Sequence, residues 1–265
     1  MAIFRHHLRR EAAALVGWTV AVMALVVLQT SLYTVLARPA VSAEMVTALH
    51  GLPGQLVQFV GGNLNLFNVS GWLGVVDLSG WITLIVGIWL ALASVSVVTS
   101  DVDHQMLEFL LALPVGRGRL LFERSLSLLA QLALMYAGIF VAVQLALAVI
   151  GQGVDGTRLG EALGVLLLDQ AALAGTLVLI SLFLRDQTYA MLATVTATAV
   201  FVFIPVFVEP NSPVAFLRHL TPFDYSAAGG LMVQGTYPSG QIFLAAVWTL
   251  AAFLVAWAVF TRQEV

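Results

Sequence analysis

The sequence contains no cysteine and no lysine, and charged residues of any kind are scarce. Without cysteine the chain cannot form a disulfide, a thiolate nucleophile, an iron–sulfur cluster or a zinc site with thiolate ligands. Without lysine it cannot form a Schiff base, and it lacks the phosphate-binding lysine of a GxxxxGK[ST] loop. These absences exclude several classes of chemistry before any motif is considered.

The shortage of charge also indicates that the chain is surrounded by lipid rather than by water. Only 9% of the 265 residues are charged and 60% are hydrophobic, whereas soluble globular proteins carry about 25% charged residues. So few charges cannot cover a surface that faces water, so a soluble enzyme, a soluble binding module and a disordered chain are all excluded. We predict an all-α integral membrane protein. The net charge of −3 gives no indication of a nucleic-acid partner.

Five long intervals without charge, and a sixth that contains Asp169, predict six transmembrane helices, because charged residues are costly in the hydrocarbon core. Each interval holds about the 20 residues that a span needs. The predicted spans cover about 14–36, 79–99, 126–149, the interval 161–185, the interval 186–209 and about 241–260. With the N-terminus inside, eight arginines lie in inner segments and three in outer loops. The positive-inside rule therefore favours both termini inside.

Two segments outside the spans also have a recognisable pattern. Residues 1–13 place Phe4 and Leu8 on one side of a helix and Arg5 and Arg9 on the other, which is typical of a helix in the membrane interface. The apolar run that follows is too long for a signal peptide, so we interpret it as an anchor. The outer segment 209–240 is apolar and broken by prolines, which predicts re-entrant or interfacial elements.

The inner loop Thr99–Arg124 predicts a short amphipathic helix over 101–116. Acidic residues at its start favour a helix N-terminus, leucines give it an apolar side, and Pro114 ends it. Such a helix either buries its apolar side on the spans of its own chain or docks on a partner chain. The residues alone leave both interpretations open.

The stretch DHQMLEFLLALPVGRGRLLFER resembles the cytoplasmic loop of ABC transporter permeases of the type-2, exporter-like class. The matching residues are Asp103, Leu107, Glu108, Leu110, Leu111, Pro114, Val115 and Arg117. LTPFDYSAAGGLM resembles the outer segment before the last span of that family, and FTRQEV resembles its chain end. The chain departs from the family in Gln105 and Met106, where Gly-Thr is common.

The resemblance implies that 1–265 is a single transmembrane permease domain without catalytic residues. Residues 101–116 would be a coupling helix in the groove of a separate ATPase subunit, with contacts from Asp103, Glu108, Leu110, Leu111, Pro114 and Arg117. Two ATPase copies would drive two permease chains, as a homodimer or a heterodimer, in a bacterial cytoplasmic membrane. ATP and Mg²⁺ would bind to the ATPase, and this chain would hold no cofactor. The alternative is a self-contained channel or scaffold whose inner loop packs on its own spans.

Polar residues within the spans give weaker indications. Thr194, Thr198 and Phe201 share one side of the fifth span, where they either line a substrate path or pack against another helix. We expect Asp169 to lie at the outer interface beside Gln170; a functional acid inside the membrane is the alternative. The weakly charged spans suit lipid-like or amphipathic substrates better than ions.

Two apparent motifs carry no chemistry. The GxGxxG pattern at 151–156 follows a membrane span rather than a strand, so we interpret it as a turn. The histidines are scattered over both sides of the membrane and give no metal-ligand spacing. The sequence therefore shows no nucleophile and no metal-ligand set that an intramembrane enzyme would need.

Overall fold

The computed structural model describes residues 2–36, 38, 68–98, 116–184, 186–208, 211–225, 231, 232, 235 and 239–262. Within these ranges every regular element is a helix, which confirms the all-α class. Six of the described helices contain a stretch long and apolar enough to cross a membrane. The chain is therefore a multi-pass integral membrane protein.

The six long helices follow the uncharged intervals of the sequence. They are α2 (Ala12–Leu36), α6 (Thr83–Val98), α8 (Arg117–Val149), α9 (Gly156–Leu182), α10 (Gln187–Phe207) and α12 (Ser239–Arg262). A short helix α5 (Val69–Trp72) and a π-helix η1 (Leu73–Ile82) lead directly into α6. The second apolar span begins inside that π-helix, at Gly80.

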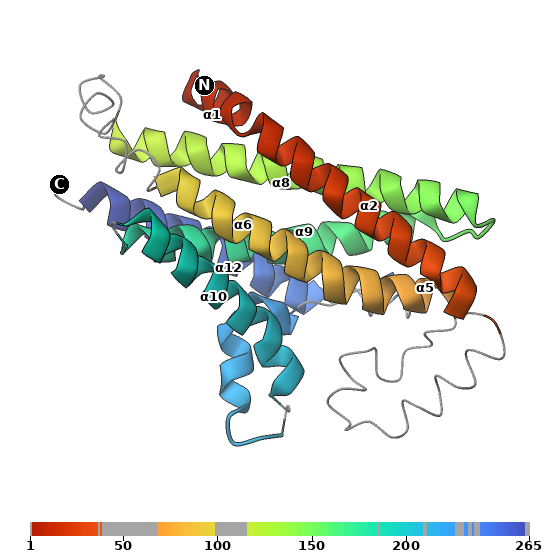
Figure 1. Ribbon diagram of the computed structural model, residues 1–265. Coiled ribbons are helices and arrows are strands. Elements are labelled where there is room, and N and C mark those ends of the chain that lie inside the picture. Colours follow the sequence, from red (N-terminus) through yellow and green to blue (C-terminus); the bar gives the residue numbers. More distant parts are fainter. Residues whose placement is uncertain are drawn as a thin grey trace.

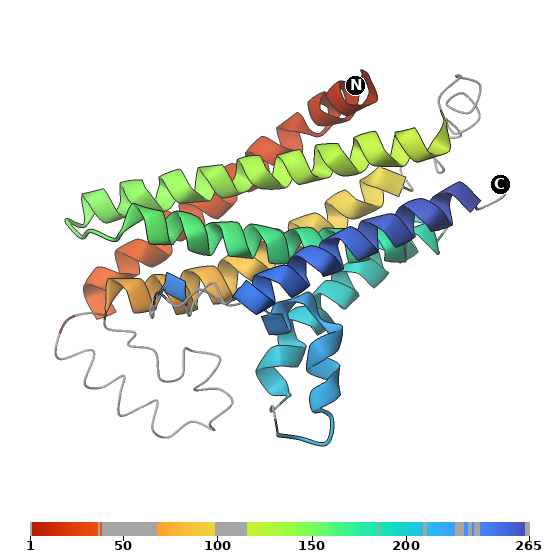
Figure 2. The same ribbon diagram turned by 180° about the vertical axis from the view of Figure 1, so that it is seen from behind.

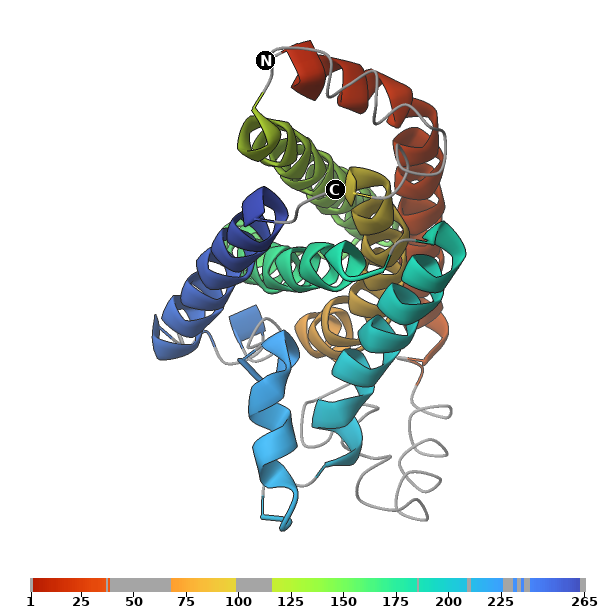
Figure 3. The same cartoon turned by 90° about the vertical axis from the view of Figure 1, so that its left-hand side faces the viewer.

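Successive long helices run in opposite directions (Figures 1 and 2). One end of the bundle, which we call the base, carries α1 (Ala2–Arg10), the last residues of α6, α9 and α12, and the first residues of α8 and α10 (Figure 3). Both ends of the chain thus lead to the same side of the bundle, as an even number of spans requires. The inside orientation of this side stays a prediction.

Helix α9 lies at the centre and contacts α6, α8, α10 and α12. Its middle is rich in small buried residues, which let neighbouring helices approach closely. A Cβ atom added to Gly175 would lie 2.9 Å from the Cβ atom of Ala252 on α12. A side chain at position 175 would therefore press against the side chains of α12, and glycine permits this close packing.

Two helices begin earlier than the sequence predicted. Helix α8 starts at Arg117 rather than near residue 126, so residues 117–124 of the predicted inner loop are helical. Helix α9 starts at Gly156, because Oδ1 of Asp155 accepts a hydrogen bond of 2.9 Å from the amide of Thr157 and caps it. The GxGxxG pattern forms the connection between these helices, with Gly151 at a φ angle of 69°. The interpretation of this pattern as a turn is confirmed.

The segment between α10 and α12 contains two 3₁₀-helices, η2 (Ala215–Leu220) and η3 (Pro222–Tyr225). Nη1 of Arg218 donates a hydrogen bond of 2.9 Å to the carbonyl of Val208 and ties η2 to the end of α10. Together with the end of α10, η2 projects from the body of the bundle (Figure 1). Short elements are what the prolines of this segment predict; their depth in the membrane stays a prediction.

Candidate functional site

The predicted coupling segment joins α6 to α8 at the base. Asp103, Glu108, Leu110, Leu111 and Pro114 lie outside the described residues, and Arg117 is the first residue of α8. Their contacts with an ATPase stay predictions. The structure does describe the two helix ends that the segment connects, and these ends are held together by polar side chains.

A polar stripe runs along the first turns of α8. Arg119, Glu123, Ser127 and Gln131 are spaced four residues apart, so they share one face of the helix. Nε of Arg119 donates to Oε1 of Glu123 at 2.9 Å, and Nε2 of Gln131 donates to Oγ of Ser127 at 3.3 Å. We call these four residues, together with Arg124, the polar clamp.

The polar clamp fixes α1 to α8. The amide of Phe4 donates a hydrogen bond of 3.2 Å to Oε2 of Glu123. One turn further on, Nδ1 of His7 and Oγ of Ser127 share a hydrogen bond of 3.3 Å. Because His7 is 7% exposed and Glu123 is 6% exposed, these contacts are shielded from solvent. Helix α1 is thus attached to α8 by a buried contact at His7 and a partly buried one at Phe4.

Arg124 joins α8 to α6. Its Nη1 donates a hydrogen bond of 3.0 Å to the carbonyl of Val97, in the last turn of α6. The last carbonyls of a helix have no partner within the helix, and a positive charge at that end is favourable. Arg124 therefore holds α6 at the place where the chain leaves it, about two turns from the place where the chain enters α8.

The position of the polar clamp allows it to transmit a displacement between helices. Burying a charge is costly unless the charge is hydrogen-bonded. Glu123 and Arg124 are buried and hydrogen-bonded in ways that link three helices. A displacement of the segment between α6 and α8 would therefore act on α1, α6 and α8 together.

The sequence analysis did not identify Glu123, Ser127 or His7. A signal was present in the spacing of Arg119, Glu123, Ser127 and Gln131, because polar residues at every fourth position of an apolar helix form a stripe. The charge of Arg124 instead indicated the end of a loop. Its role in the helix depends on the carbonyl of Val97, which lies on another helix.

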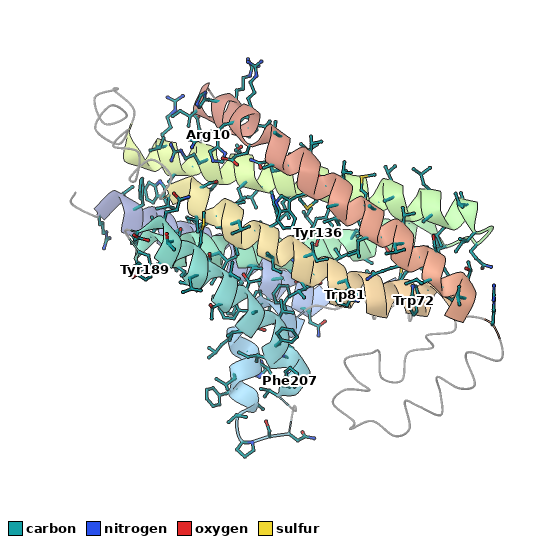
Figure 4. All side chains as sticks on the ribbon, viewed as in Figure 1. Arg10, Trp72, Trp81, Tyr136, Tyr189 and Phe207 are labelled. Carbon is teal, nitrogen blue, oxygen red and sulfur yellow. The ribbon has the colours of Figure 1, made fainter. Side chains whose placement is uncertain are left out.

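A second polar group lies in the middle of the bundle. Asp169 is the central residue of α9 and is fully buried, so the prediction that it lies at the outer interface is wrong. The reason is the early start of α9 at Gly156, which adds two turns before the apolar run. Tyr136 of α8, which is also buried, lies midway along the bundle (Figure 4).

Gln170 continues this central group toward α6. Its Nε2 donates a hydrogen bond of 2.9 Å to the carbonyl of Thr83, at the junction of η1 and α6. Within the part of the chain that the structure describes, neither the hydroxyl of Tyr136 nor Oε1 of Gln170 has a hydrogen-bond partner. The centre of the bundle thus holds polar side chains that are only partly satisfied by protein groups.

The residues predicted for a substrate path pack on α6. Thr194 and Thr198 of α10 are fully buried. The hydroxyl of Thr194 donates to the carbonyl of Ala190 at 2.9 Å and approaches that of Ala91 on α6 at 3.1 Å. Phe201 is partly buried against the same core. This geometry favours helix packing, and a role in a substrate path stays a prediction.

The chain matches the model of a known protein family. The family model described as ABC-2 family transporter protein matches residues 18–265, which is nearly the whole chain. The search of curated proteins finds no match.

Proposed function

The chain belongs to the ABC-2 family of transporter permeases, and we propose that it is the permease of an exporter that a separate ATPase drives through residues 101–116. Permeases of this family are transport subunits that normally pair with an ABC ATPase. The coupling residues of the proposal are Asp103, Glu108, Leu110, Leu111, Pro114 and Arg117. ATP and Mg²⁺ would bind to the ATPase, since this chain has no lysine for a phosphate-binding loop.

The observation that carries the proposal is the polar clamp. A coupling segment has to transmit a displacement to the spans, so its two ends need firm attachment. Arg124 of α8 holds the last turn of α6, and Glu123 holds α1. Two copies of the ATPase and a second permease chain would complete the transporter, in the cytoplasmic membrane of a bacterium.

The proposed substrates are lipid-like or amphipathic. The support is the low charge of the spans, which offers few partners for an ion. Thr194 and Thr198 belong to the path only if α6 and α10 separate during transport, because both threonines are buried between these helices. The closed packing of these two helices then represents one state of the cycle.

The test combines co-purification with one charge reversal. We expect a soluble ATPase with a GxxxxGK[ST] loop to co-purify with the chain from its host in mild detergent. We expect Glu108→Arg to lower the permease-stimulated ATPase rate at least about tenfold. A tenfold loss corresponds to about 1.4 kcal/mol of lost interaction free energy. The folded permease should be recovered in unchanged yield.

The matched control is Glu161→Arg, which reverses a charge on α9 near the end of the bundle opposite the base. It should leave the stimulated rate unchanged. A chain that repeatedly purifies alone and well folded would instead favour the self-contained channel or scaffold. An equal rate for Glu108→Arg and the wild type would reject the coupling role of 101–116.

A further inference from the structure

Helix α1 has two faces of different character. One face packs on α8 through the amide of Phe4 and the buried ring of His7. The opposite face is exposed and carries three arginines and a histidine. These residues are Arg5, His6, Arg9 and Arg10. The arginine-rich end of the helix is visible at the edge of the bundle, near the label of Arg10 (Figure 4).

The contacts of α1 indicate its depth in the membrane. His7 meets α8 at Ser127, which lies about 33 Å from Val149 at the far end of that helix, at about 1.5 Å per residue. The hydrocarbon core of a bilayer is about 30 Å thick. If Val149 marks one boundary of that core, α1 lies at the other boundary, at the depth of the lipid headgroups.

Two arginines on this face, Arg5 and Arg9, are available to a ligand. Within the described residues neither Arg5 nor Arg9 forms an ion pair, and the two are one helical turn apart. The acidic side chain nearest to α1 on α8, Glu123, bonds with Arg119 and with the amide of Phe4. A guanidinium group matches the geometry of a phosphate, with which it forms paired hydrogen bonds.

We propose that the exposed face of α1 that carries Arg5 and Arg9 binds the headgroups of anionic phospholipids. The face combines unpaired positive charge, phosphate-matching geometry and headgroup depth. Helix α1 thereby anchors the base of the bundle to the anionic leaflet through one face and to α8 through the other. This inference goes beyond the proposed function and does not depend on an ATPase partner.

The test measures lipid selectivity with the full-length chain in phosphatidylcholine nanodiscs. Trace amounts of spin-labelled phosphatidylglycerol and phosphatidylcholine report which lipid is held at the protein surface. We expect the wild type to prefer phosphatidylglycerol, and Arg5→Gln/Arg9→Gln to lower this preference by up to about fivefold per arginine. In 1 M salt, where screening acts over about 3 Å, the preference of the wild type should also fall.

The control variant removes the same charge from the opposite end of the bundle. Arg38 and Arg158 are exposed near the far ends of α2 and α9, and Arg38→Gln/Arg158→Gln should keep the wild-type preference. The variant Arg5→Lys/Arg9→Lys keeps the charge but loses the paired hydrogen bonds of the guanidinium groups, so its preference should lie between those of the wild type and Arg5→Gln/Arg9→Gln. Equal selectivity of the two glutamine variants, or a wild type without preference, would overturn the proposal.

Discussion

At the base of the bundle the charged side chains of α8 reach neighbouring helices, whereas at its centre α9 packs closely on its neighbours and Gln170 adds a hydrogen bond to the carbonyl of Thr83. Arg124 and Glu123 form hydrogen bonds that join separate helices. Around Asp169, by contrast, α9 is held by close backbone approach, as at Gly175. The comparison teaches that the base depends on directional contacts of charged groups, whereas the centre combines close packing at small residues with the hydrogen bond of Gln170.

The largest effect is expected where volume is added at the centre. Gly175→Leu would place side-chain atoms where Ala252 and Phe253 of α12 already lie within 3.2 Å of an added Cβ. We expect the free energy of unfolding in mixed detergent micelles to fall by about 3 kcal/mol, as overpacking of a tight interface does.

The control for this substitution lies on the same helix. Gly164 of α9 is exposed, and no atom lies within 4 Å of an added Cβ. Gly164→Leu should therefore leave the free energy of unfolding within about 0.5 kcal/mol of the wild type. Similar losses for both variants would contradict the close approach of α9 and α12.

The next effect is expected at the base, where a directional contact is removed. Arg124→Leu leaves the carbonyl of Val97 without its charged donor. We expect a loss of about 2 kcal/mol in the free energy of unfolding, the range of hydrogen bonds to charged groups. Hydrogen exchange should increase in the last turn of α6 and remain unchanged in the middle of α9.

Arg158→Leu serves as the control, because Arg158 is half exposed and its nearest acidic atom, Oδ2 of Asp155, is 3.7 Å away. We expect this change to cost less than about 1 kcal/mol, as for surface ion pairs. If exchange at the end of α6 stays slow in Arg124→Leu, the clamp does not hold that helix.

The smallest effect is expected for a polar group that bonds within its own helix. The hydroxyl of Thr198 donates to the carbonyl of Thr194 at 2.8 Å, and its methyl group faces Gly87 of α6. Thr198→Val keeps this shape, so we expect a change within about 0.5 kcal/mol and an unchanged ATPase rate of the complex. Thr196→Val, at an exposed position of α10, is the control.

A loss of activity in Thr198→Val at unchanged stability would contradict the packing role and place Thr198 on the substrate path. The bulkier Thr198→Leu is unsuitable for this purpose. Its additional atoms would meet Gly87 and so disturb the packing of α6 on α10.

The six spans could be predicted because exclusion of charge from the membrane is a strong and local signal. The same rule misplaced two helix ends. It treated Arg124 as part of a loop, although Arg124 is buried in α8 through a bond to another helix. It also delayed the start of α9, since Arg158 and Glu161 lie on its first turns. Charges of this kind are compatible with a helix that extends beyond the hydrocarbon core.

The position of Asp169 shows a different limit. Its burial follows from where α9 begins, and that depends on the cap formed by Asp155. The family could be identified from the motif between α6 and α8, and the match over 18–265 confirms it. The polar clamp could not be found from charge alone, because each of its bonds between helices has a backbone group or a distant residue as partner.

The length of α8 has a consequence for leverage. Its 33 residues span about 50 Å, some 20 Å more than the hydrocarbon core. Arg124 and Glu123 attach α8 to its neighbours near the level where the helix enters the membrane. They therefore act as a pivot, with a shorter part of α8 toward Arg117 and a longer part toward Val149. A rigid tilt about such a pivot turns a small sideways push at the shorter part into a larger swing at the opposite face of the membrane.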